Sequence, residues 1–439
     1  MVRNENLKDF IRYTVSNILG ILGISCYILA DTFFVSKGLG ADGLTALNLA
    51  IPAFNFIQGC GLMFGIGGAA RYSMFKSQGD DRLANRIFTN TVILALGAAL
   101  IFALVGFFLA DSLARLLGAN EAVFDMTRTY LQILLIFSPA FMMNAVLLSF
   151  VRNDGAPQLA MVAMVAGSLS NIVMDYIFIF PFGLGILGAV LATGVSPVLS
   201  MLILSRHWRK GGCGFRLVNM RPDVQLSATT VALGFPSLVT EVSAGVVMIM
   251  FNMIILGLLG NVGVAAYGVI ANLSLVVTAF YNGIAQGMQP LISRAYGQSD
   301  QKSIGQILKY AMVTMMVLSV VLYVIIGGLA DPITSVFNSE GNAQLQHIAV
   351  VGLRLYFISV LFVGFNIVLS MFFVAVDRPV PGQIVSVLRG FLIIVPMTIV
   401  LAALWGVYGV WLAYPAAEGV TALVGVWLWW RFVRKTVKI

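Results

Sequence analysis

The chain has 439 residues, of which 59% are hydrophobic and only 10% are charged, and its formal net charge is +8. Soluble domains carry about 25% charged residues, so this composition excludes a soluble globular protein and predicts a polytopic membrane protein. The positive charge does not indicate nucleic-acid binding, because the basic residues lie between apolar segments, as in membrane topology. The cysteines (Cys26, Cys60, Cys213) and histidines (His207, His347) are scattered, without the spacing of a disulfide framework or a metal motif.

Twelve apolar segments are long enough to be membrane-spanning helices, which need about 20 mostly apolar residues. They are expected at 12–36, 44–72, 87–110, 124–151, 158–180, 185–206, 228–259, 264–293, 305–329, 346–375, 380–403 and 407–431. The first segment is too long for the core of a signal peptide and is interpreted as the first transmembrane helix. The predicted fold class is therefore an all-α polytopic membrane protein.

The basic residues predict an orientation in the membrane. All of the 26 lysine and arginine residues lie in segments on the side of the two termini, except Lys37, Arg115, Arg128, Arg354 and Arg389. Basic residues are enriched in cytoplasmic loops, so both termini are expected in the cytoplasm of a multi-pass protein in the plasma (inner) membrane.

The two halves of the chain resemble each other at an offset of about 220 residues. Leu-Ala-Asp at 109–111 recurs at 329–331, and the glycine pair at 185 and 188 recurs at 406 and 409. Repeated halves with six spans each should form two six-helix bundles, related by a pseudo-two-fold axis along the membrane normal, with a transport pathway between them. The expected organisation is an N-terminal lobe (1–206), a cytoplasmic linker (207–226) and a C-terminal lobe (227–439).

Polar residues of the first half converge on one level of the membrane. Asp31 and Asp175 each lie about 9 Å from the outer end of their span, and Thr193 about 12 Å from its own, at a rise of 1.5 Å per residue. Asn171 lies one helical turn from Asp175 on the same face. These four residues are the expected cation-coupling site, for a proton or for Na⁺. The alternative for Asp31 alone is an interfacial carboxylate that reaches water.

The second half carries different charges. Glu241, Glu418 and Arg389 lie near the middle of their spans, whereas the repeat places Phe251 opposite Asp31. Two interpretations remain open: Arg389 forms a buried ion pair with one of the glutamates, or these residues form the polar floor of a substrate cavity. Candidate substrate-binding residues are Glu241, Asn282, Gln286, Asn366, Arg389 and Glu418. Helix-to-helix hydrogen bonds explain the amides equally well.

Several stretches together resemble the multidrug and toxic compound extrusion (MATE) family, over essentially all twelve spans. These stretches are LADTFFVSKGLGADGLTALNLAIP, VRNDGAP, NIVMDYIFIFPFGLGILGAVLAT, LGFPSLVTEVSAG and GIAQGMQPLISRAYGQ. The GMQPLIS stretch is similar to a bacterial drug-efflux branch of that family.

The resemblance implies export of amphipathic, often cationic, compounds, driven by Na⁺ or H⁺. It implies a coupling site at Asp31, Asn171, Asp175 and Thr193, and it matches Glu241 to a family glutamate. The chain departs from many relatives in lacking a proline in its first span, and in having Asn366 where some relatives have an acid. The expected protein is a monomeric transporter rather than an enzyme. It needs no cofactor besides the coupling ion, and its partners are small molecules and the bilayer, not nucleic acid.

Three alternatives remain. A flippase for lipid-linked oligosaccharides would hold phosphate with cavity cations, for which only Arg389 and Arg354 are candidates. A membrane-embedded prenyltransferase would need paired acidic motifs, and the chain offers only Asp80-Asp81 in a basic loop. Uptake instead of export also stays open.

Overall fold

The computed structural model describes residues 2–209, 211–338 and 341–432, and within these ranges the chain is helical and has no strand. Residue 210 of the linker and the basic tail residues Arg434, Lys435 and Lys438 lie outside the described residues. The first half contains α1 (Val2–Ser77), α2 (Asp81–Leu116), α3 (Phe124–Ile136), α4 (Ser138–Asn153), α5 (Pro157–Ile179), α6 (Ile186–Leu204) and α7 (Arg206–Arg209). The second half contains α8 (Val224–Gly297), α9 (Gln301–Gly328), α10 (Ala330–Phe337), α11 (Ala343–Tyr356), η1 (Phe357–Ser359), α12 (Val360–Ala375), α13 (Pro379–Val387), η2 (Leu388–Leu392) and α14 (Ile394–Phe432). The predicted all-α fold class is confirmed.

Three of the long helices are each interrupted at one glycine. Gly40 in α1 and Gly260 in α8 have φ of 67° and 64°, and Gly406 in α14 has φ of 58°. Only glycine adopts this backbone region without a steric penalty, so the chain reverses within one or two residues instead of through a polar loop. The first two breaks lie 220 residues apart, which is the offset of the sequence repeat.

The helices are consistent with twelve spans. By length and composition, the described part of the chain has eight helices that can cross a membrane, or nine if the bent pair α3–α4 is one span. Three of these nine, α1, α8 and the α13–α14 segment, are divided at the glycines described above. Exposed apolar side chains such as Phe107 and Phe108, 64% and 72% exposed, require lipid around the bundle.

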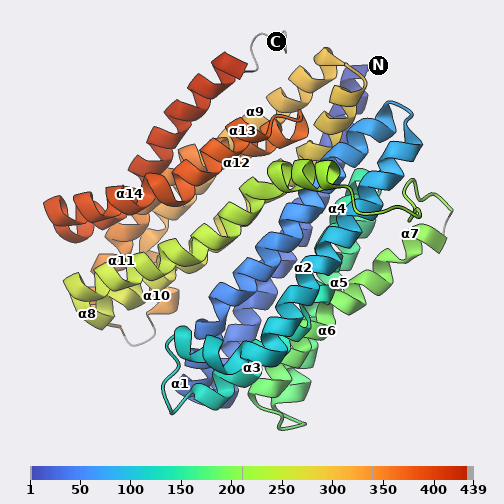
Figure 1. Cartoon of the computed structure of the whole chain (residues 1–439). Coiled ribbons are helices and arrows are strands. Elements are labelled where there is room, and N and C mark those ends of the chain that lie inside the picture. Colours follow the sequence, from blue (N-terminus) through green and yellow to red (C-terminus); the bar gives the residue numbers. More distant parts are fainter. Residues whose placement is uncertain (1, 210, 339–340, 433–439) are drawn as a thin grey trace.

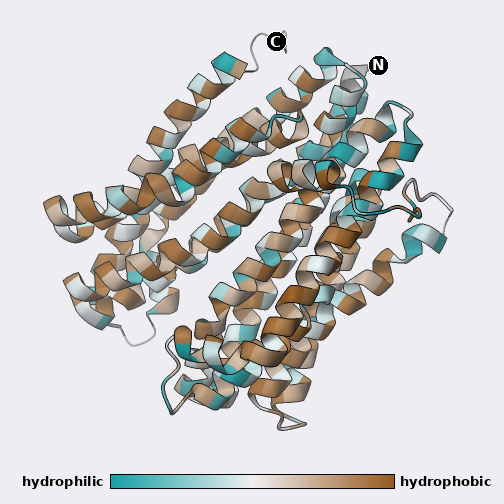
Figure 2. Cartoon of the chain, in the orientation of Figure 1, coloured by the Kyte–Doolittle hydropathy of each residue, from teal (hydrophilic) through white to brown (hydrophobic). Residues whose placement is uncertain are grey.

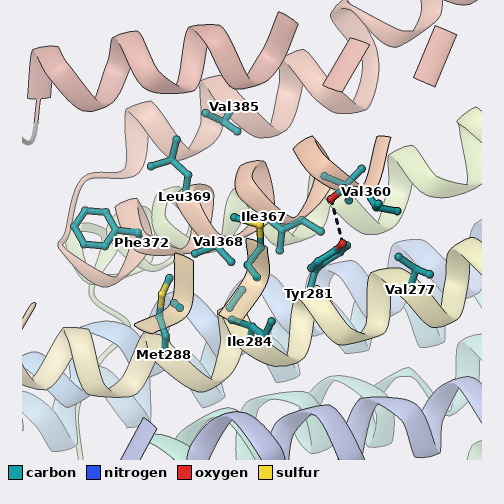
Figure 3. Close-up of a cluster of buried hydrophobic side chains, with 14 of the residues drawn as sticks. Val277, Tyr281, Ile284, Met288, Val360, Ile367, Val368, Leu369, Phe372 and Val385 are labelled. Atoms are coloured by element: carbon teal, nitrogen blue, oxygen red, sulfur yellow. Dashed lines mark hydrogen bonds between the residues drawn. The ribbon is translucent and has the colours of Figure 1, made fainter. Parts of the chain in front are cut away.

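The helices form two lobes that meet at the end where both termini lie and diverge from there (Figure 1). Helices α1–α6 form one lobe, and α8–α14 form the other. Figure 2 shows apolar residues along the shafts of the helices and hydrophilic residues toward their ends and connections. Each lobe has its own apolar core. Figure 3 shows the apolar core of the second lobe. There the Tyr281 hydroxyl donates to the Val360 carbonyl oxygen at 3.1 Å, which satisfies a polar group among apolar side chains.

The backbones of the two lobes contact each other at the end of the molecule where both termini lie, called the terminal end below. A Cβ atom added at Gly234 would lie 1.8 Å from the Met63 carbonyl oxygen, and one added at Gly67 would lie 2.1 Å from the Thr230 carbonyl oxygen. On the same side, the Asn6 side chain donates to Ser303 Oγ at 3.0 Å. The absence of a side chain at these glycines allows α1 and α8 to approach closely, and this contact closes the terminal end.

Arg152, which the sequence groups with the loop cations, is buried between the lobes instead. It is 3% exposed because α4 continues to Asn153, and this end of the helix lies against α1 and reaches α8 through hydrogen bonds. Its Nη1 atom donates to Gln286 Oε1 at 2.7 Å and also to Asn17 Oδ1. Next to it, the side chains of Asn153 and Gln289 exchange two hydrogen bonds of 3.1 Å. A polar network with one buried cation therefore joins the two lobes.

Candidate functional site

Three helices of the first lobe place four polar side chains at one buried cluster. Asp31 comes from α1, Asn171 and Asp175 from α5, and Thr193 from α6. All four are buried, with exposed fractions of 7%, 0%, 0% and 3%. The structure thus brings together the four residues that the sequence predicted as a coupling site, because α5 and α6 pack against each other and against α1.

Asn171 links the members of this cluster. With its amide oriented to satisfy both neighbours, its nitrogen donates to Asp175 Oδ2 at 3.0 Å and its oxygen accepts from the Thr193 backbone N–H at 3.2 Å. The Thr193 hydroxyl donates to the Ala189 carbonyl oxygen at 3.1 Å. These bonds hold the α5 carboxylate and the α6 backbone in fixed positions, as a preorganised site requires.

The carboxyl groups of Asp31 and Asp175 lie close enough to interact electrostatically. Oδ1 of Asp31 and Oδ1 of Asp175 are buried, and neither has a hydrogen-bond partner among the described residues. Two adjacent buried carboxylates are costly unless a proton or a cation neutralises them. Hard cations prefer such oxygen ligands, so the cluster suits either a shared proton or Na⁺ as the transported coupling ion.

Sequence reasoning missed two tyrosines beside this cluster. Tyr130 of α3 is 4% exposed and lies beside Thr193. Tyr27 lies within electrostatic range of Asp31 and Asp175. Tyr27 is one helical turn before Asp31 on the same face, and this i, i+4 spacing was the signal that could have found it. For Tyr130 the sequence contains no comparable signal.

A second polar site lies between the lobes. An open cavity there is lined by Leu62 and Ile66 of α1 and by residues of α8, α12, α13 and η2. Of the predicted substrate-binding residues, Glu241, Asn282, Gln286 and Arg389 line this cavity. The Glu241 side chain forms no ion pair with any described residue, so its carboxylate is available to a ligand.

The other two predicted residues lie behind the cavity wall. Glu418 is 1% exposed and accepts from Arg389 Nε at 3.1 Å and Nη2 at 2.9 Å. Asn366, which is fully buried, donates to Glu418 Oε2 at 2.7 Å. Of the two glutamates that the sequence offered to Arg389, the structure pairs it with Glu418. This contact leaves Glu241 as the uncompensated acid of the cavity.

Comparisons with known proteins agree with this architecture. The sequence model of the MatE family matches residues 17–177 and 236–400. The chain is 26% identical to the multidrug export protein MepA of Staphylococcus saprophyticus, over 97% of this chain and 93% of that protein. It is 23% identical to MepA of Staphylococcus aureus strain MRSA252, over 95% and 92% of the two chains.

Solved structures show the same fold. A multidrug resistance MATE family transporter of the MOP superfamily in an outward-facing conformation superposes with a TM-score of 0.91 and 24% identity, over 99% of this chain and 97% of that chain. The resemblance seen in the sequence motifs is thereby confirmed. Because the family model covers well over half of its length, in both lobes, the chain belongs to the MatE family of membrane transporters.

Proposed function

We propose that the protein is a secondary active antiporter that exports amphipathic, often cationic, compounds in exchange for Na⁺ or H⁺ by alternating access. The observation that carries this proposal is the pair of buried carboxylates, Asp31 and Asp175, each with one oxygen unpartnered among the described residues. The similarity to proteins named multidrug export protein supports the substrate class. In this proposal the protein works as a monomer in the plasma membrane, and the coupling ion is its only inorganic requirement.

The coupling follows from differential binding. A cation or proton neutralises Asp31 and Asp175 and stabilises the arrangement of the first lobe that holds these carboxylates close together. A ligand shifts a conformational equilibrium only by its difference in affinity for the two states. The cluster lies within the first lobe, whereas the cavity lies between the lobes. Ion release therefore changes the conformation of the first lobe, and the shape of the cavity changes with it.

The state described here is closed at the end of the termini, where Gly67 and Gly234 approach the opposite lobe. With both termini in the cytoplasm, as the basic residues predict, this state faces outward. The buried Arg152 supports a gate at this end, because it bridges Asn17 and Gln286 from the two lobes. Opening toward the cytoplasm exchanges these hydrogen bonds for water, so the two states can have similar free energies.

Cavity electrostatics favour cationic substrates. Within the described cavity lining, Arg389 is compensated by Glu418, whereas Glu241 has no ion-pair partner. The flippase alternative needs free cations in the cavity and finds none among these lining residues. Aliphatic residues such as Leu62, Ile66 and Met371 provide apolar surface, and methionine adapts to varied ligand shapes.

The test is dye efflux from proteoliposomes with Na⁺ and H⁺ gradients imposed separately. Asp31→Asn and Asp175→Asn should each abolish gradient-driven efflux while the purified protein remains folded. The matched control is Asp111→Asn, because Asp111 is an exposed surface residue paired with Arg128 at 2.5 Å. Full efflux by either of the two buried variants contradicts the coupling role.

A further inference from the structure

Three possible metal ligands from separate segments converge beside the linker. Asp154 follows the end of α4, His207 lies in α7 at the start of the linker, and Cys213 lies further along the linker. One carboxylate oxygen, one imidazole nitrogen and the sulfur atom all lie within 4.8 Å of one another. His207 Nε2 is 2.7 Å from Asp154 Oδ2. Neither the transport pathway nor the coupling cluster contains these residues.

The carboxylate and the imidazole are held in place by neighbouring groups. The Tyr72 hydroxyl donates to Asp154 Oδ1 at 2.5 Å, and the Gly214 backbone N–H donates to Oδ2 at 2.7 Å. The His207 ring stacks on Phe215, with centroids 5.9 Å apart. Hydrogen bonds that orient a ligating carboxylate are typical of metal sites.

The donor set also has the right chemistry. Zinc in proteins prefers cysteine sulfur, histidine nitrogen and carboxylate oxygen, with about 2.0–2.3 Å from the metal to each donor and tetrahedral geometry. Donors around such an ion lie roughly 3–4 Å apart by that geometry. The observed separations, 2.7 Å between His207 Nε2 and Asp154 Oδ2 and at most 4.8 Å among all three donors, are close to these values. Cys213 is half-buried, so the site is accessible from the aqueous side.

We propose that Asp154, His207 and Cys213 bind a divalent transition metal ion of the zinc type, with water as the fourth ligand. Without metal, the Cys213 thiol donates to the Phe215 carbonyl oxygen at 3.1 Å. When the ion binds, the thiol proton leaves to solvent and the thiolate bonds to the metal, as ligand deprotonation requires. The His207 nitrogen then bonds to the metal instead of to Asp154, while Tyr72 and Gly214 keep their bonds to the carboxylate.

A bound ion fastens the linker between the lobes to the first lobe. The α7 helix and residues 211–215 are then tied to the α4–α5 turn by three coordinate bonds. Lys76 already contacts this segment, because its Nζ donates to the Gly214 carbonyl oxygen at 3.1 Å. The metal therefore restricts the start of the linker, and the expected result is slower backbone hydrogen exchange in that segment.

The test uses the purified full-length protein after chelator treatment. Co²⁺ should produce a thiolate-to-metal charge-transfer absorption in the wild type, and Cys213→Ser should abolish it. Zn²⁺ affinity, measured by competition with a chromophoric chelator, should fall at least 100-fold in Cys213→Ser and in His207→Gln. Cys26→Ser is the matched control, since Cys26 is a free cysteine in α1, remote in sequence from the cluster, and it should leave both readouts unchanged.

A milder variant tests the supporting hydrogen bond. Loss of a partner that orients a metal ligand typically lowers metal affinity about 10–100-fold. The Zn²⁺ affinity of Tyr72→Phe should therefore be about 10–100-fold lower than that of the wild type. Zn²⁺ affinity that is equal in the wild type, Cys213→Ser and His207→Gln overturns the proposal. A Co²⁺ spectrum without a thiolate band also overturns it and leaves a hydrogen-bonded cluster only.

Discussion

The buried ion pair of Arg389 and Glu418 allows a sharp test of the second lobe. Glu418→Gln keeps the shape of the side chain but removes its charge. The Arg389 side chain is 10% exposed and donates two hydrogen bonds to Glu418 Oε1, so the substitution leaves a buried cation without its counter-ion. Removing one partner of a buried pair typically costs about 3–5 kcal/mol. The folded-to-unfolded ratio should therefore fall roughly 150- to 4,000-fold, at 1.4 kcal/mol for each factor of ten.

The measurement is the free energy of unfolding in mixed micelles titrated with a denaturing detergent, followed by circular dichroism. Glu241→Gln is the matched control: it makes the same chemical change in an acid that has no ion pair within the described residues. The free energy of unfolding of this control should fall by less than about 1 kcal/mol, as is usual for substitutions away from core and ion-pair features.

The double variant Arg389→Met, Glu418→Leu completes the test. Replacing both members of a buried pair with apolar residues is often neutral or stabilising by about 1–4 kcal/mol. We therefore expect the double variant to be at least as stable as Glu418→Gln, and close to the wild type. Equal losses for Glu418→Gln and Glu241→Gln would refute the assignment of the ion pair.

Three other predictions concern transport. Glu241→Gln should weaken binding of cationic dyes more than of neutral ones, measured by fluorescence titration; an equal loss for both classes argues against a charge contact. Gly234→Ala should retain fold and dye binding but lose efflux, because the added Cβ collides with the Met63 carbonyl oxygen when the terminal end closes. Gly257→Ala, which meets only open space, is its control, and normal efflux by Gly234→Ala would contradict the closure. The apparent Kd for dye should rise to a plateau as the Na⁺ or H⁺ concentration rises, because coupling between separate sites is finite and reciprocal. In Asp175→Asn, which removes the coupling site, this rise and its plateau should be absent. An unlimited linear rise indicates one shared site.

The sequence alone was sufficient for the fold class and the family, because long apolar segments and their repeat determine how many helices must cross the bilayer. It also grouped Asp31, Asn171, Asp175 and Thr193. The constant rise of a helix converts residue number into depth, so groups at equal depth on neighbouring spans can be recognised before the structure is known.

Residue number does not determine which face of one helix meets which face of another. The remaining features of the sites depend on this packing of helix faces. Glu241 and Glu418 lie at similar depth, yet only helix packing showed that Glu418 pairs with Arg389 and that Glu241 faces the cavity. Packing also buried Arg152 between the lobes and brought Tyr130 to Thr193. The convergence of Asp154, His207 and Cys213 depends on where an extended linker returns to the first lobe. Contacts between distant segments depend on the mutual rotation and packing of helices, which a one-dimensional pattern does not contain.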